Sequence, residues 1–485
     1  MVRLLQPLVT LAVIAAPSVA FASDGGDHSG GNPLLWLCVA SLTCTLMCMA
    51  FLEMGIKALA DRTGNGLSPT ALKRVEFFCK PEVLASFGAL GTLMLFLSFN
   101  GPTSVLAHVM GNIDMLAAVL VMAMMFQSLQ LGRFVNKLMA WVQRRSGGNE
   151  ATFNFIAMIL IGFASSLLSE VAVAAAVTGS VALVNMNQSR KAKEQILVLE
   201  ASAVGVGGGL TNFAAPSIVI AANAFGWSTL ETAMYLGPAV LVSLLIVAFE
   251  AKKVSANCED SVKIENQPLR GIDFVNLVLW AGVLWFGVFS DPRSIVGMLV
   301  MLVISLAINL FYAVKFEKLT PADESAEEAT GAEHSHNPIL HLMEQAWESA
   351  LVFAFLFSLM FMGDLIADAI KMFGEQLPTD PMGRSIALFW TSDIFSGWAD
   401  NALAVFQLAP ISYTTGEQIG TAWGSLTGGV MTLIGNAPNI VVWLIFIKAG
   451  VRLSFVGWIR RVFPVAVKLA LFGAFYTAAV VWIFG

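Results

Sequence analysis

Long apolar stretches separated by short polar segments run through most of the chain. Many of them reach the roughly 18–20 residues that a helix needs to cross a bilayer. The pattern predicts an all-α polytopic membrane protein with about ten transmembrane helices. We expect these spans at residues 34–57, 83–100, 113–132, 195–224, 229–250, 272–289, 294–314, 346–370, 417–446 and 463–484.

Two further apolar stretches, 152–186 and 385–411, are too long for one crossing, and each has a polar block near its middle. We interpret each as a re-entrant helical hairpin, in which two half-helices meet at a tip inside the membrane. A single tilted and kinked helix is the alternative for either stretch.

A polar motif pair occurs twice. Ser-Ser-Leu-Leu-Ser-Glu (165–170) precedes Gly-Gly-Gly-Leu-Thr-Asn (207–212), and Ser-Gly-Trp-Ala-Asp-Asn (396–401) precedes Gly-Asn-Ala-Pro-Asn (435–439). Matching interruptions of apolar segments in two halves of a chain point to the substrate site of a secondary transporter. We therefore expect an inverted-repeat transporter fold, with repeats over 83–250 and 295–484, an N-terminal segment over 23–82 and a connecting span within 251–294.

The two halves are similar but not identical. The second half has the shorter connection between its hairpin and its broken helix, and Ser169-Glu170 aligns with Asp400-Asn401. The two polar sites are therefore not expected to be equivalent.

The distribution of basic residues gives the orientation. With residue 23 outside, twenty-two Lys and Arg residues fall on the cytoplasmic side and three on the outside, the bias known for inner-membrane proteins. This threading places both termini outside, opens the first hairpin to the cytoplasm and opens the second to the exterior. It also predicts an interfacial helix over 134–145 and an acidic cytoplasmic linker over 316–342.

Composition supports the same class. Hydrophobic residues make up 57% of the chain and charged residues 12%, against about 25% charged in soluble domains. The net charge of -6 argues against nucleic-acid binding. Residues 1–22 have the layout of a signal peptide cleaved after Ala22, so we expect a bacterial inner-membrane protein with a periplasmic N-terminus.

The hairpin tips supply the first candidate site residues. Free backbone groups at membrane depth need polar partners, and helix capping alone is enough to explain serines there. A buried carboxylate, in contrast, needs a cation or a proton. The candidates are Ser165, Ser169 and Glu170 at the first tip, and Ser396, Asp400 and Asn401 at the second.

The broken helices supply the others. Pro216 and Pro438 interrupt two spans, and the neighbouring glycines permit unwound backbone. Those glycines are Gly207, Gly208, Gly428, Gly429 and Gly435. Side-chain oxygen ligands come from Thr211, Asn212, Asn436 and Asn439. We expect Na⁺ at Glu170 with Asn212 and at Asp400 with Asn436, while a kink that serves only packing or gating is the alternative.

Other acidic residues in the apolar stretches are weaker candidates. Asp393 lies in the first arm of the second hairpin and is a candidate second proton carrier. Glu53, Glu200, Asp364 and Asp368 lie nearer the ends of their spans, where water is expected to reach them.

The order of hairpin and broken helix, repeated in inverted orientation, resembles the ion-transporter superfamily and, within it, a family of Na⁺/H⁺ antiporters. The residues that carry this resemblance are Ala399-Asp400-Asn401-Ala402, Thr211-Asn212-Phe-Ala-Ala-Pro216 and Gly435-Asn436-Ala-Pro438-Asn439. The resemblance implies rocking of the hairpins against a scaffold and a homodimer. Carboxylate carriers of the superfamily show Ser-Asn-Thr at both tips, and this chain departs from that pattern.

These features together predict a secondary transporter, not an enzyme, that exports Na⁺ or Li⁺ in exchange for H⁺, with Glu170 and Asp400 binding either ion in turn. Its partners would be a small inorganic cation and membrane lipid, with no cofactor. One alternative is a Na⁺-coupled carrier of anions, carboxylates or oxyanions. Another is a channel or a non-transporting membrane subunit.

Overall fold

The computed structural model describes residues 93–94, 97, 101–104, 106–107, 110, 132–168, 170–256, 262–264, 268–286, 295–316, 370–398, 400–433, 435–451 and 453–484. All the helices named below lie in one compact unit formed by Met110–Phe353 and Ala369–Gly485. Within the described residues the structure is helical and contains no strand.

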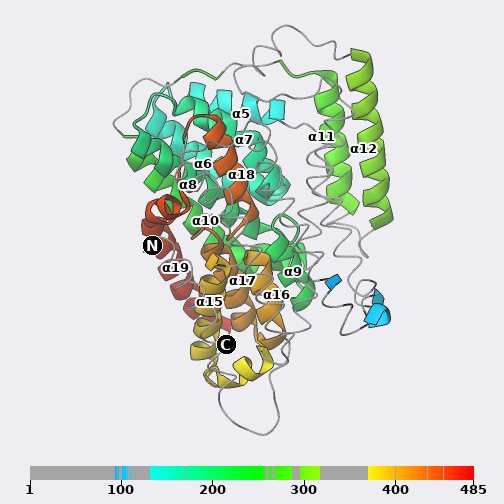
Figure 1. Ribbon diagram of the computed structural model, residues 1–485, viewed down its shortest axis with the longest axis vertical. Helices are drawn as coiled ribbons and strands as arrows, with labels where there is room; N and C mark the ends of the chain where they lie inside the picture. Colours follow the sequence, from blue (N-terminus) through cyan, green and yellow to red (C-terminus); the bar gives the residue numbers. More distant parts are fainter. Residues whose placement is uncertain are drawn as a thin grey trace, which may run out of the picture. The chain divides into compact units, whose positions relative to one another are not determined.

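Figure 1 shows the helices of this unit in chain order. The first half contains α5 (Gly132–Arg145), α6 (Glu150–Leu168), α7 (Glu170–Val184), α8 (Arg190–Gly207), the short 3-10 helix η1 (Gly208–Leu210), α9 (Pro216–Phe225) and α10 (Thr229–Val254). The middle part contains α11 (Gly271–Leu284) and α12 (Ile295–Phe316). The second half contains α15 (Pro381–Trp398), α16 (Asn401–Leu408), the 3-10 helix η3 (Ala409–Ile411), α17 (Thr415–Gly429), α18 (Ala437–Lys448) and α19 (Phe455–Phe484).

Helices occupy the apolar stretches that the described residues cover, and they break at the predicted polar blocks. The stretch 152–186 is divided between Leu168 and Glu170, and the stretch 385–411 between Trp398 and Asn401. The expected spans 34–57, 83–100, 113–132 and 346–370, the signal peptide and the linker 316–342 lie outside the described residues, apart from residues 93, 94, 97, 132, 316 and 370. The expected acidic residues Glu53, Asp364 and Asp368 also lie outside them.

Three helices of the described part are long and apolar enough to cross a membrane. They are α6 over Glu150–Leu167, α10 over Thr229–Val254 and α19 over Phe455–Ile483. The length of α6 suits a full crossing as well as a hairpin arm, so the re-entrant course of the first hairpin stays a prediction.

The same set of contacts between hairpin tip and broken helix occurs in both halves. Thr211 donates its hydroxyl to the carbonyl of Ser166, and Thr432 donates to the carbonyl of Gly397 in the same way. A side chain on Gly207 would collide with the backbone of Gly162, and one on Gly428 with the backbone of Asp393. The close approach of these helices therefore requires small residues at equivalent places in the two halves.

The two halves are interlocked through the second parts of their broken helices. In each half the first hairpin arm packs against the first part of that half's own broken helix, α6 against α8 and α15 against α17. The second parts cross over, because α9 packs against α16 and α18 packs against α7. Figure 1 shows the resulting order, with α6, α7 and α18 towards one end of the unit and α9, α15 and α16 towards the other.

Helix α5 has the features expected of an interfacial helix over 134–145. Val135, Met139 and Val142 are buried, whereas Trp141 is 45% exposed and the guanidinium of Arg145 lies over its ring. An amphipathic helix with aromatic and basic residues on its outer face is typical of the membrane interface.

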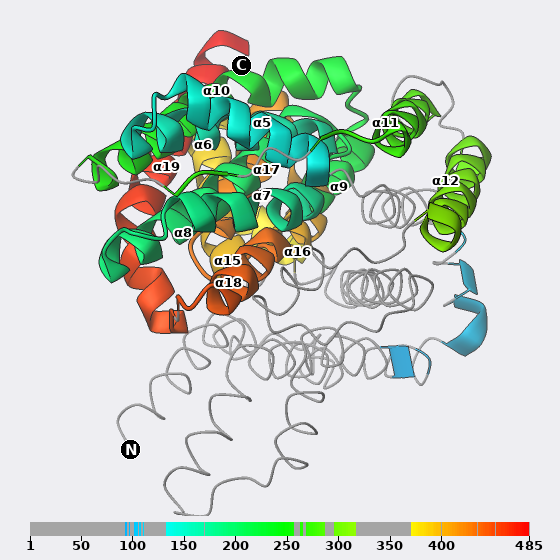
Figure 2. The same ribbon diagram turned by 90° about the horizontal axis from the view of Figure 1, so that it is seen from above.

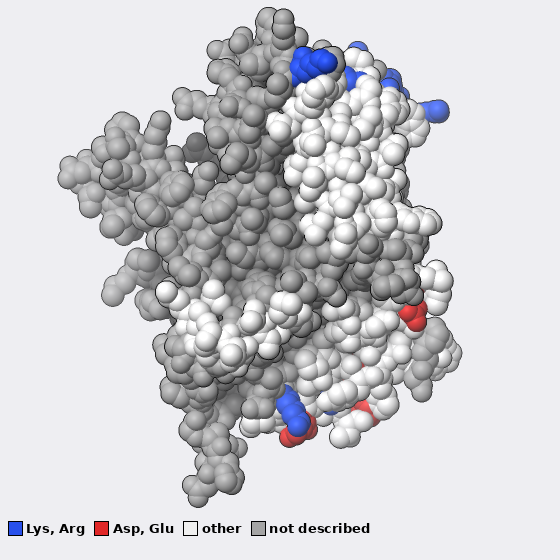
Figure 3. Space-filling view, turned by 90° about the vertical axis from the view of Figure 1, so that its right-hand side faces the viewer, with Lys and Arg blue, Asp and Glu red and all other residues white. Residues whose placement is uncertain are grey.

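Helices α11 and α12 form a pair beside the interlocked halves (Figure 2). Asn276 and Asn309 exchange two side-chain hydrogen bonds between them, at 2.9 and 3.0 Å. Arg133 of α5 lies 3.5 Å from the Asp273 carboxylate and joins this pair to the rest of the unit. On the face drawn in Figure 3, Lys and Arg gather at one end of the described surface, and a broad uncharged band separates them from charges at the other end. This distribution is the one expected for a surface facing lipid.

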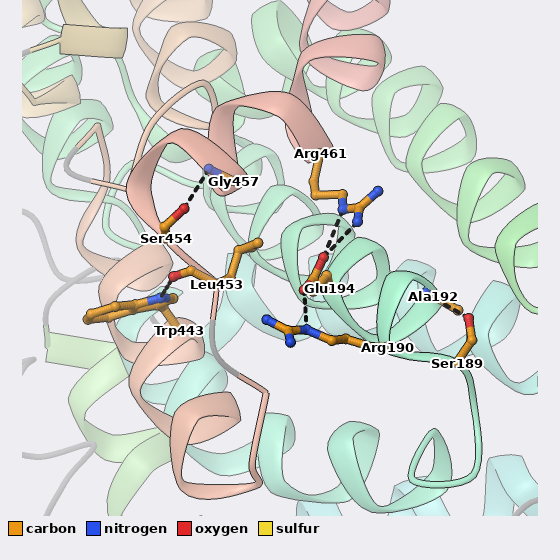
Figure 4. A network of polar contacts seen from close by, with 9 residues as sticks. All are labelled: Ser189, Arg190, Ala192, Glu194, Trp443, Leu453, Ser454, Gly457 and Arg461. Atoms are coloured by element: carbon orange, nitrogen blue, oxygen red, sulfur yellow. Dashed lines mark hydrogen bonds and ion pairs between the residues drawn. The ribbon is translucent and has the colours of Figure 1, made fainter. Parts of the chain in front are cut away.

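The start of α8 is tied to α19 by an ion network (Figure 4). Glu194 accepts hydrogen bonds from Arg190 at 2.9 Å and from Arg461 at 2.7 Å. Glu194 lies directly before the expected span 195–224. Burial alone would raise the pKa of its carboxyl, but the hydrogen bonds and charges of Arg461 and Arg190 outweigh burial and hold the pKa below its usual value.

Candidate functional site

The tip of the first hairpin meets the break of the second broken helix. Glu170 begins α7 and is fully buried, and its Oε2 accepts a hydrogen bond from the Asn436 amide at 3.3 Å. Asn436 stands directly before α18, the helix that packs against α7. The crossing of the two halves thus brings together a carboxylate from one repeat and an amide from the other.

The tip of the second hairpin lies close to this pair. Asp400 caps α16 by accepting a hydrogen bond from the Ala402 N–H at 2.8 Å, as the structural alternative for this residue predicts. The next residue, Asn401, donates its N–H to the carbonyl of Gly435, the residue before Asn436, so Asp400 lies near the Glu170–Asn436 pair. Capping does not explain Glu170, because its Oε2 bonds to a side chain of another helix and not to its own backbone.

Several buried polar atoms around this site have no hydrogen-bond partner in the described part of the chain. They are Glu170 Oε1, Asn436 Oδ1, Asn439 Oδ1 and Asn401 Nδ2. Buried polar groups are normally paired, so unpaired ones in a cluster indicate a place for a ligand. Three of the four are oxygens, the atoms that bind Na⁺ in broken transporter helices.

Glycines let the broken helices approach these groups. A Cβ on Gly208 would lie 3.1 Å from Glu170 Oε2, and one on Gly205 would lie 2.9 Å from Asn436 Nδ2. Both positions tolerate no larger residue unless the two site side chains move.

The hydroxyl side chains of the predicted site mainly hold the tips against the broken helices. Ser165 donates to the carbonyl of Val204 at 2.7 Å, and Ser396 donates to that of Ser425 at 2.6 Å. Asn439 donates its amide to the carbonyls of Gly429 and Thr432. The side-chain oxygens of Ser165, Ser396 and Asn439 keep free lone pairs. Ser169 lies outside the described residues.

Backbone hydrogen bonds position both tips in the same way. The N–H of Glu170 donates to the carbonyl of Ala214, and the N–H of Asn401 donates to that of Gly435. These contacts make Glu170 the counterpart of Asn401, in agreement with the alignment of Ser169-Glu170 with Asp400-Asn401. Helices α9 and α18 restart at Pro216 and Ala437, so both predicted breaks are present.

Asn212 lies elsewhere. Its Oδ1 accepts a hydrogen bond from Thr229 at 2.8 Å, and its Nδ2 donates to the carbonyl of Trp227. The expected pairing of Glu170 with Asn212 is therefore not the one in the structure, where Asn436 takes that place. No sequence motif indicates this exchange, because it depends on how the two halves of the chain pack against each other.

Two more carboxyl groups are buried in the helices. Asp393 on α15 accepts a hydrogen bond from Thr427 at 2.6 Å and is almost fully buried. Glu200 on α8 is fully buried, which corrects the expectation that water reaches it near the end of a span. The span was expected to begin at residue 195, but α8 begins at Arg190 and is covered by neighbouring helices along this part.

Among the comparisons with known proteins, the family match indicates a transporter. No curated protein matches the chain. Among solved structures, the YdaH transporter of Alcanivorax borkumensis, described as having an unusual topology, is similar at 14% sequence identity and a TM-score of 0.47. That likeness covers 79% of this chain and 90% of the other. The citrate transporter family (CitMHS) matches residues 77–426, well over half of the chain, and this protein belongs to that family.

Proposed function

We propose that this transporter exports Na⁺ or Li⁺ in exchange for H⁺, with Glu170 and Asp400 as the ion-binding carboxyl groups. The observation that carries the proposal is the contact of Glu170 with Asn436, near which the Asn401–Gly435 hydrogen bond holds Asp400. Neither carboxyl group forms an ion pair with a Lys or Arg in the part of the chain that the structure describes. Glu170 is buried and Asp400 is partly exposed, and carboxylates in such a place without a cationic partner favour a cation or protons as their ligands.

Competition at one site then couples the two fluxes. Na⁺ entering from the cytoplasm displaces protons from Glu170 and Asp400, and protons arriving from outside displace Na⁺. Rocking of the hairpins against the remaining helices would expose the site to each side in turn. Asn436 and Asn439 offer free side-chain oxygens to the bound cation.

A Na⁺-coupled citrate carrier is the second candidate, and the family match favours it. In such a carrier the same carboxylates would hold the driving Na⁺. The unpaired amide donor of Asn401 and the helix N-termini at the site would bind a substrate carboxylate. The two candidates differ in the transported solute, so transport assays separate them.

Everted membrane vesicles from cells without their own antiporters test the proposal. We expect addition of Na⁺ or Li⁺ to release protons from energised vesicles, whereas K⁺ and Ca²⁺ serve as comparison ions. Glu170→Gln and Asp400→Asn should each abolish the response, and Glu375→Gln, at an exposed position, should preserve it. Normal exchange in both site variants would refute the site, and Na⁺-dependent uptake of labelled citrate without proton release would favour the carrier.

A further inference from the structure

Glu200 is a buried carboxyl group that the proposed exchange does not use. It lies on α8, eight residues before Gly208, and eight residues along a helix correspond to about 12 Å. Since a Cβ built on Gly208 would lie 3.1 Å from Glu170 Oε2, Glu200 stands about two helical turns from the ion site along α8. Neither of its oxygens has a hydrogen-bond donor in the described part of the chain.

The surroundings of Glu200 show which protonation state fits. Glu200 is fully buried, and the Thr178 hydroxyl on the neighbouring helix α7 donates to the carbonyl of Ala174. A carboxylate that is buried without a donor or a cation is costly, whereas a carboxylic acid is neutral. Glu200 therefore fits this place as the protonated acid.

No charged group of the described residues compensates a negative charge on Glu200. The helices that pack against α8 are α6, α7, α10, α17, α18 and α19. Their titratable side chains form no ion pair with Glu200. These side chains are Glu150, Glu170, Glu231, Tyr235, Glu250, Lys252, Lys253, Glu417, Lys448, Arg460, Arg461, Lys468 and Tyr476.

A buried polar cluster lies farther along the same face of α7. Thr178 is followed seven residues later by Asn185, which accepts hydrogen bonds from Asn154 at 2.7 Å and from Gln188 at 2.7 Å. Gln188 also donates to Glu150, and Asn154 donates to Ser255. We call these five residues, Glu150, Asn154, Asn185, Gln188 and Ser255, the inner polar cluster.

The inner polar cluster lies at the end of the unit that carries basic residues. Ser255 follows Lys252 and Lys253 at the end of α10, and Glu150 follows Arg144 and Arg145 of α5. The positive-inside bias assigns this end to the cytoplasm. Glu200 thus stands between the ion site and the cytoplasmic surface, on a part of α8 whose preceding residues, Ile196 to Leu199, are buried and apolar.

We propose that Glu200 is a proton-binding station that passes protons between the Glu170/Asp400 site and the inner polar cluster. This inference rests on the proposed Na⁺/H⁺ exchange. When Na⁺ occupies the ion site, Glu200 releases its proton towards the cytoplasm and takes up the proton leaving Glu170. Only protons move in this step, and the charge of Na⁺ balances the site. Na⁺ itself does not visit Glu200, because a single carboxyl and one hydroxyl give it too few ligands.

Glu200→Gln tests the role, because glutamine has the shape of the protonated acid but cannot release a proton. The purified variant in proteoliposomes would be compared with Glu375→Gln in two assays. The first is exchange of labelled Na⁺ against Na⁺, which moves no proton. The second is Na⁺-driven proton flux. We expect near-parent Na⁺ self-exchange and a loss of proton flux of about a hundredfold, the size typical of removing a positioned proton-transfer group.

Proton flux that survives in Glu200→Gln would overturn the inference while leaving the proposed exchange intact. Loss of both fluxes would also overturn it, because Glu200 would then be needed for Na⁺ binding or for folding. If the parent protein shows no Na⁺ response, the proposed function fails, and infrared difference spectra between parent and Glu200→Gln still report the proton. A carboxylic-acid band in the parent at neutral pH that the variant lacks is expected, and its absence would refute the proton on Glu200.

Discussion

Asn436 donates its side-chain amide to Glu170 across 266 positions of the chain, at 3.3 Å and with both residues buried. The contact exists because α18 of the second repeat packs against α7 of the first. A hydrogen bond between two repeats at a hairpin tip couples the positions of both. Movement of either hairpin relative to its partner would therefore change the surroundings of the Glu170 carboxylate.

Asn436→Ala should weaken the response to Na⁺. The substitution would remove the amide oxygen proposed as a cation ligand, and loss of the N–H leaves Glu170 without its hydrogen bond. We expect the Na⁺ concentration for half-maximal proton release to rise about tenfold, which corresponds to roughly 1.4 kcal/mol. Asn212→Ala is the matched control and should change this concentration little, because Asn212 bonds to Thr229. Equal effects of the two variants would restore the pairing expected from sequence.

Gly205→Ala should disturb the same amide without touching a polar group. Its Cβ would lie 2.9 Å from Asn436 Nδ2 and would push the side chain away from Glu170. We expect weaker Na⁺ affinity with little loss of the helix, measured as the Na⁺ dependence of proton release. Gly179→Ala on α7 is the control, since nothing lies within 4 Å of its Cβ. A variant with unchanged Na⁺ affinity would show that the Asn436 amide does not matter for binding.

Bound Na⁺ should protect the purified protein against unfolding. A ligand that binds only the folded state stabilises it by about 2.7 kcal/mol at a hundred times its dissociation constant. We expect the unfolding temperature in detergent to rise with Na⁺ and with Li⁺ when choline balances ionic strength. Glu170→Gln should remove most of this shift. An equal shift in Glu170→Gln would place the cation elsewhere.

The ion network at the start of α8 should contribute pH-dependent stability. Glu194 has a pKa below its ordinary value of 4.5 in the folded protein, since Arg461 and Arg190 stabilise the carboxylate beyond the effect of burial. A lowered folded-state pKa gives stability that is present above pH 4.5 and is lost as pH falls through the folded-state value. Glu194→Gln should therefore lower the free energy of unfolding at pH 7 by roughly 1–2 kcal/mol, and the unfolding temperature should fall with it.

The difference between Glu194→Gln and the parent should shrink as the pH falls below 4.5. Glu375→Gln, at an exposed position, should behave like the parent throughout. A difference that is constant over this range would mean that packing, and not charge, ties α8 to α19.

The sequence predicts the local elements well, because local chemistry determines them. Serine and acidic residues inside apolar stretches mark the tips, and glycines with Pro216 and Pro438 mark the breaks. Each of these signals lies within a few residues of the tip or break that it marks. The helix ends at Leu168 and Gly207 follow from them directly.

The partners across the repeats are not predictable in this way. Asn212 and Asn436 follow similar motifs, yet only Asn436 reaches a carboxylate, because the crossing of α9 and α18 is decided by packing between distant segments. Glu200 is misjudged for a related reason. Its distance from the end of a span was the criterion, whereas its burial depends on helices from other parts of the chain that pack against α8. Its spacing of two helical turns from Gly208 is the signal that could have identified it.

Proton release from energised everted vesicles on addition of Na⁺, compared between parent and Glu170→Gln, tests the central claim most directly. Proton release in the parent that is absent in Glu170→Gln and preserved in Glu375→Gln is the expected result. Proton release of equal size in parent and Glu170→Gln would contradict the assigned site. A parent that ignores Na⁺ and Li⁺ across a range of pH but accumulates citrate would contradict cation exchange itself.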